Sequence, residues 1–77
     1  MTDLARNAKH RHLLEAGLWG MWNRAVSRPE LEKKANALMT TINGTESPPF
    51  LEAKDEAVVI EYLDPGMKKA YQALFGF

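Results

Sequence analysis

The sequence predicts an all-α fold, a small four-helix domain. Several stretches repeat apolar residues every three or four positions, as one side of a helix requires, and residues that start or stop helices separate them. The chain has no cysteine, and 45% of its residues are hydrophobic, which is typical of a folded domain with a core of its own. We expect one helical domain over 1–77, with helices at about 3–26, 28–42, 49–63 and 66–75.

The first of these helices contains GLWGMW at residues 17–22, which holds both tryptophans of the chain. Trp22 falls within the apolar stripe and is expected in the core, whereas Trp19 falls at its margin and is expected to be partly exposed. Gly17 and Gly20 lie together beyond the other margin, where they form a strip that either lets a neighbouring backbone come close or marks a break in the helix at Gly17. The stripe itself consists of Leu14, Leu18, Met21, Trp22 and Ala25.

The second helix has the clearest start signal. Ser27 and Glu30 stand at the spacing of a capping box, and Pro29 occupies the first turn, where its missing N–H has no consequence. Gly44 marks the end of the helix. We expect the leucines and the isoleucine of the apolar stripe in between to be buried. That stripe consists of Leu31, Ala35, Leu38, Met39 and Ile42.

The segment after Pro48-Pro49 fits two structures. Its apolar residues can be placed on helical stripes, but the run 57–60 is rich in β-branched residues, which favour strands. Because no second strand is evident to pair with it, we expect a helix over 49–63. The alternative is an α+β fold with a short strand at 57–63. Asp64-Pro65-Gly66 then predicts a cap and a turn before the last helix.

The formal net charge is zero, but the charges are unevenly distributed. Residues 1–28 carry five basic and two acidic residues, whereas 46–64 carry six acidic residues and one lysine. Such asymmetry either steers association with a charged partner or allows the two halves of the molecule to face one another.

The sequence shows no recognisable catalytic set. His10 and His12 are two positions apart and point to nearly opposite sides of a helix, so they cannot share a metal ion, and we interpret both as solvated polar residues. Neither a nucleophile with an adjacent base nor a phosphate-binding glycine loop is evident. We therefore expect no enzymatic activity, no metal and no cofactor.

Three groups of residues are predicted to contact other molecules. Trp19 is the first, because tryptophan is enriched at the energetic centres of protein interfaces. The acidic set either imitates nucleic-acid phosphate for a protein partner or is only a solvated helix face; it consists of Glu52, Asp55, Glu56 and Glu61. The basic set is the nucleic-acid candidate and consists of Arg6, Lys9 and Arg11.

The leading hypothesis is a non-enzymatic module that docks on a larger protein and modulates it, as an inhibitor or an adaptor. In general style the chain resembles small accessory proteins of bacteria and their viruses. A helical DNA-binding regulator is second, because the residues around Gly17 do not fit a helix-turn-helix and the chain is not basic overall. A structural subunit of a homo-oligomer is third. Without a secretory signal or an apolar run of about 18 residues, we expect a cytoplasmic protein that does not span a membrane.

Overall fold

The computed structural model describes residues 3–76, with side chains from residue 5 onward, and it is all-α in this part of the chain. The predicted fold class is confirmed, and the alternative strand at 57–63 is wrong, since residues 57–60 are helical. None of the helices within 3–76 is both long and apolar enough to cross a membrane. The helices are α1 (Asp3–Arg24), α2 (Pro29–Asn43), α3 (Ala53–Ile60) and α4 (Pro65–Phe75).

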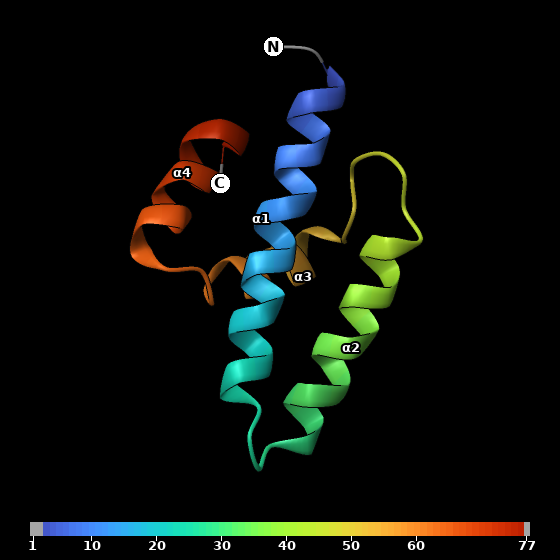
Figure 1. Cartoon of the computed structure of the whole chain (residues 1–77), viewed down its shortest axis with the longest axis vertical. Coiled ribbons are helices and arrows are strands. Elements are labelled where there is room, and N and C mark those ends of the chain that lie inside the picture. Colours follow the sequence, from blue (N-terminus) through green and yellow to red (C-terminus); the bar gives the residue numbers. More distant parts are fainter. Residues whose placement is uncertain (1–2, 77) are drawn as a thin grey trace.

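The long helix α1 is the centre of the molecule. The other three helices all pack against it: α2 and α4 flank it on opposite sides, and α3 crosses behind it in the view of Figure 1. The molecule is correspondingly flat, with extents of 41 × 27 × 17 Å. Because three sides of α1 are taken in this way, its fourth side has no helix in front of it.

The buried core follows the two predicted stripes. Leu14, Leu18 and Met21 of α1 are completely inaccessible to solvent, and Leu38 and Ile42 of α2 are buried opposite them, as predicted. Leu31 was also predicted to be buried. That prediction is wrong, because Leu31 lies near the start of the helix and is only partly buried. The full core consists of Leu13, Leu14, Leu18, Met21, Ala35, Leu38, Ile42, Phe50, Leu51, Val59, Ile60, Leu63 and Tyr71.

The two glycines of α1 mark the place where the third helix and its end cross behind the first. A Cβ atom at Gly17 would lie 2.6 Å from Val59 Cγ1 and 2.7 Å from the Val59 carbonyl oxygen. A Cβ atom at Gly20 would lie 2.5 Å from the carbonyl oxygen of Tyr62. Both distances are shorter than real side chains tolerate, so the predicted close approach of a neighbouring backbone is confirmed.

The turn between α1 and α2 differs from the predicted capping box. Ser27 adopts a left-handed conformation with φ 64°, so Arg28 becomes the N-cap and no side chain caps the helix. The chain instead closes this turn through the backbone, with the Arg28 N–H bonding to the Ala25 carbonyl at 2.9 Å. As a result α1 ends at Arg24, two residues earlier than expected, and α2 begins at Pro29.

The third helix is shorter than predicted at both ends, since it covers Ala53–Ile60 instead of 49–63. Phe50 and Leu51 are consecutive and are both buried, at 2% and 6% exposure. The backbone at these two residues is irregular, and α3 begins after them. The fourth helix begins at Pro65 with Asp64 as an N-cap that makes no side-chain cap bond, and it ends at Gly76 in a left-handed conformation.

Candidate functional site

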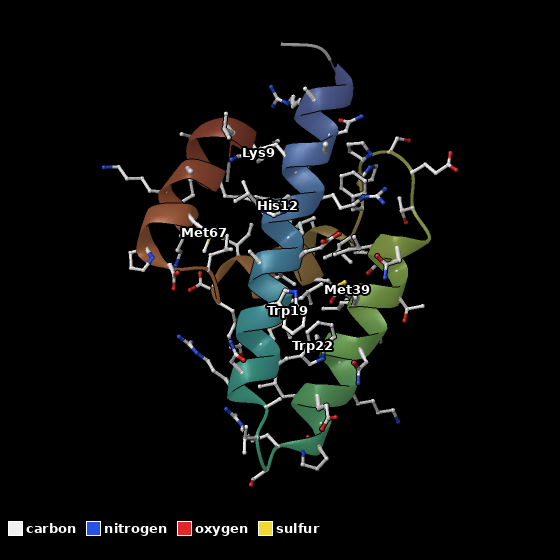
Figure 2. The ribbon with its side chains drawn as sticks, in the orientation of Figure 1. Lys9, His12, Trp19, Trp22, Met39 and Met67 are labelled. Carbon is white, nitrogen blue, oxygen red and sulfur yellow. The ribbon has the colours of Figure 1, made fainter. Side chains whose placement is uncertain are left out.

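The uncovered side of α1 carries the most exposed aromatic side chain that the structure describes. Trp19 is 61% exposed, and its ring meets that of Trp22 edge-on, with 5.1 Å between ring centroids. Figure 2 shows both rings on the side of α1 that faces the viewer, towards Met39 of α2. We call Trp19, Trp22 and Met39 the tryptophan face.

The helix period explains why Trp19 is exposed. It follows Gly17 by two residues, which is a rotation of 200° around the helix, and Gly17 is held against α3. The side chain must therefore point to the side of α1 that no helix covers. The predicted exposure of Trp19 is confirmed.

Trp22 is less buried than its place in the stripe predicted. Its ring packs against the core only in part, and its Nε1–H donates to Asn36 Oδ1 at 3.0 Å. Buried tryptophans need a partner for this donor, and here the partner lies at the surface of α2. Trp22 thus packs against the core as predicted, but it is only partly buried, and its hydrogen bond lies at the surface.

Two open hollows lie along α1, one towards each end of the helix, and Trp22 of the tryptophan face lines the smaller one. The larger, of about 350 Å³, lies under the 45–50 loop and we call it the Phe50 hollow. The smaller, of about 290 Å³, lies at the α1–α2 turn and we call it the Val26 hollow. The Phe50 hollow is lined by Asn7, Ala8, Arg11, His12, Glu15, Glu46 and Phe50. The Val26 hollow is lined by Trp22, Ala25, Val26 and Glu32.

The structure does not bring the four predicted acidic residues together as one free surface. Three of them lie near lysines on three different elements, and the fourth, Glu56, points into the molecule. The ion pairs are Lys34–Asp55 at 3.7 Å, Lys54–Glu52 at 3.7 Å and Lys68–Glu61 at 2.9 Å. The uneven charge of the sequence is thus partly balanced within the fold, and partner binding by these acids stays a prediction.

Glu56 belongs to a polar cluster that the sequence did not reveal. His10 Nε2 lies 2.9 Å from Glu56 Oε2 and 2.6 Å from the hydroxyl of Tyr71, and that hydroxyl donates to the same carboxylate. The His10 ring also stacks on Phe75, with 4.2 Å between centroids. His10 is therefore not the solvated residue that we expected. The cluster ties α3 and α4 to α1.

The electrostatics of this cluster keep the phenol of Tyr71 protonated. Burial, then the hydrogen bond to Glu56, then the charge of Glu56 raise the pKa of Tyr71 well above its ordinary value of 10.0. Tyr71 is completely buried, whereas the side chains of His10 and Glu56 are 13% and 16% exposed. The hydrogen bonds of the cluster hold α3 and α4 against α1.

The predicted basic set is also divided. Arg6 donates to the Leu74 carbonyl at 2.8 Å, and its guanidinium lies 5.3 Å from the centre of the Phe75 ring. Arg11 donates to the Thr45 carbonyl and lies 5.2 Å from the centre of the Phe50 ring. Lys9 alone of the three is exposed without a described partner. The two arginines thus contact neighbouring segments of the fold, and nucleic-acid binding by this set stays a prediction.

Comparison with known proteins adds no family to this description. No protein-family model, curated protein or solved structure matches the chain. Within the described residues, no group of three histidine, cysteine or acidic side chains has an arrangement that could hold a metal ion. The tryptophan face is therefore the feature on which a functional argument has to rest.

Proposed function

We propose that the protein is a small, non-enzymatic binding module that docks on a larger protein through the tryptophan face. The observation that carries this proposal is the 61% exposure of Trp19, a side chain that a small domain normally covers. Tryptophan, with tyrosine and arginine, supplies most of the residues that dominate binding energy at protein interfaces.

The surroundings of Trp19 support the same function. Trp22 holds the exposed indole edge-on and is itself anchored to Asn36, so the aromatic pair is rigid before a partner arrives. A preordered anchor loses less side-chain entropy on binding than a mobile one. The hollows on either side offer room for a partner's side chains.

The proposal includes a place and a role for the module. A chain without cysteine suits the reducing cytoplasm, where we place it. Its role is to inhibit or adapt the protein that it binds, in the manner of small accessory proteins of bacteria and their viruses. A nucleic-acid regulator has less support, because Arg6 and Arg11 are engaged within the fold.

A photo-crosslinking amino acid at position 19 tests this function directly. The matched control is the same amino acid at position 37, because Ala37 is exposed on α2 and lies 200° around that helix from the buried Ala35. Both variants are expressed in the native host and irradiated. The proposal predicts a discrete adduct with one larger protein from position 19 and none from position 37.

The other outcomes distinguish the rivals. An adduct of twice the mass of the chain at position 19 identifies a homo-oligomer, and an adduct with nucleic acid identifies the regulator. Equal labelling from positions 19 and 37, or no adduct from either, contradicts a docking role for the tryptophan face.

A further inference from the structure

The charges beside the tryptophan face are mainly negative. Glu15 and Glu46 line the Phe50 hollow, and Glu32 lines the Val26 hollow. None of the ion pairs within the described residues involves any of these three glutamates. The acids in the 52–61 segment are different, because lysines or the internal cluster engage them. An unbalanced acidic rim therefore lies at both ends of an exposed aromatic surface.

Within the linings of the two hollows, the basic side chains are fewer than the acidic ones. Arg11 also lines the Phe50 hollow, but its guanidinium is engaged by the Thr45 carbonyl and lies over the Phe50 ring. His12, exposed in the same hollow, is the other basic side chain there. The Val26 hollow has no basic residue in its lining. A cationic partner would thus find carboxylates that need a counter-charge at each end.

The indole of Trp19 favours the same kind of partner. Arginines of this chain lie over three aromatic rings, those of Phe50, Tyr62 and Phe75, and none of the described arginines or lysines lies over Trp19. An exposed indole is the best cation–π acceptor among the side chains. A lysine or arginine of a partner can therefore contact Trp19 as well as the glutamates.

We propose that the tryptophan face binds a basic amphipathic helix of the partner protein; this rests on the proposed function and names the chemistry of its partner. An amphipathic helix binds by laying its apolar side against an apolar surface, and Trp19, Trp22 and Met39 supply such a surface here. The stretch of α1 from Ala8, which lines one hollow, to Trp22, which lines the other, is about 21 Å long at 1.5 Å per residue, which matches a helix of about 14 residues. The apolar side of the partner helix covers Trp19, and the lysines and arginines of the partner helix contact the glutamates.

The same charges disfavour the other occupants of this surface. A second copy that paired through the same face would bring like-charged glutamates together across the two-fold axis. Phosphate groups of nucleic acids or of anionic lipids would meet the same repulsion.

Two synthetic helical peptides test the inference. One carries leucine and tryptophan on one side and lysine and arginine on the other, and the second has glutamate in place of every basic residue. Each is added to isotope-labelled protein, and the indole N–H signals of Trp19 and Trp22 are followed by NMR. We expect the basic peptide to shift the Trp19 signal in a saturable way that added salt weakens, and the acidic peptide to leave it unchanged.

Matched charge reversals locate the contact. Glu32→Lys and Glu30→Lys change exposed residues in the first turn of α2, but only Glu32 lines a hollow, and Glu30 lies 200° around the helix from it. We expect Glu32→Lys to weaken binding of the basic peptide about three- to tenfold, and Glu30→Lys to leave it nearly unchanged.

The contrary outcomes separate this inference from the proposed function. If both peptides shift the Trp19 signal equally, the inference of a basic partner is wrong, but the proposal that this face binds a partner is not contradicted. If neither peptide shifts Trp19, or if the two charge reversals weaken binding alike, the inference is overturned, and the crosslinking at position 19 decides the proposed function separately. Self-association of the protein alone that broadens the Trp19 signal would assign the face to a second copy.

Discussion

Within residues 17–22, one side of α1 packs closely against the rest of the protein, and the other side is exposed to solvent. On the inner side, Gly17 and Gly20 allow the backbone of α3 and its end to come closer than any side chain would permit. On the outer side, Trp19 is 61% exposed and contacts Trp22 edge-on. The same six residues therefore supply a close contact between backbones and the most exposed aromatic side chain among the described residues.

This contrast explains why glycines and large side chains are interspersed within residues 17–22. α3 has eight residues, and it lies across a helix of 22 residues. It can cover only one side of α1, and it approaches closely only where side chains are absent. The glycines determine which way Trp19 faces, since the side of α1 that carries them is held against α3 and Trp19 lies on the opposite side.

The inner side should be the more sensitive to substitution. Gly20→Leu places a side chain where a Cβ atom alone would lie 2.5 Å from the Tyr62 carbonyl oxygen, so we expect a loss of about 3 kcal/mol or more in the free energy of unfolding. Urea denaturation measures it. Gly66→Ala is the control, since a Cβ atom there meets nothing within 4 Å, and it should raise stability by up to about 1 kcal/mol.

Trp22 belongs partly to each side, and its removal should have an intermediate effect. Trp22→Ala removes an indole that packs against the core and donates to Asn36. We expect a loss of about 2–3 kcal/mol, less than for a fully buried tryptophan. Thermal or urea unfolding gives the value. A loss below about 1 kcal/mol would mean that the ring is not packed as described.

The polar cluster on the inner side adds a pH dependence. Because the pKa of Tyr71 is raised when the chain is folded, the folded state holds the phenol proton at a pH where the unfolded chain releases it. Stability from this residue is therefore complete below pH 10 and falls as the pH rises above it, by at most about 1.4 kcal/mol per pH unit.

Tyr71→Phe isolates this contribution. At neutral pH the variant should be less stable by about 1–2 kcal/mol, because Glu56 and His10 lose the hydroxyl that contacts both. Above pH 10 the difference between parent and variant should shrink, which urea titrations at several pH values would reveal. A difference that stays constant up to pH 11 would contradict the assigned role of the phenol.

The outer side should contribute least to folding. Trp19→Ala removes an exposed ring, so we expect a change in unfolding free energy within about 1 kcal/mol. Association with the partner should weaken by about 2 kcal/mol or more, which is the scale of a binding hot spot. Calorimetry with the partner that the crosslinking experiment identifies measures the change in binding free energy, with Ala37→Ser as the control.

Helical periodicity and composition were enough to predict the fold class, the buried stripes of α1 and α2, and the different exposure of Trp19. Helix ends were less predictable, because Ser27 closes its turn through the backbone and leaves the expected cap unformed. The start of the third helix was predicted too early, because residues 49–52 are irregular and the helix begins only at Ala53.

The polar cluster lay beyond sequence reasoning for a different reason. His10 is 46 residues from Glu56 and 61 residues from Tyr71, so no local pattern links them. The same holds for the acidic set, whose lysine partners on α2 and α4 became visible only once the helices were placed. Local periodicity predicts elements, whereas contacts between distant polar residues depend on how those elements pack.

The accessibility of the two indoles to a soluble quencher tests directly whether α1 has an uncovered side that exposes Trp19. Two single-tryptophan variants, Trp22→Phe and Trp19→Phe, report on Trp19 and Trp22 in turn through quenching of fluorescence by a soluble quencher. In the monomeric protein we predict strong quenching of Trp19 and clearly weaker quenching of Trp22, in line with the 61% exposure of Trp19 and the partial burial of Trp22. Equal and strong protection of both indoles would contradict the account, because α1 would then have no outward side to offer a partner.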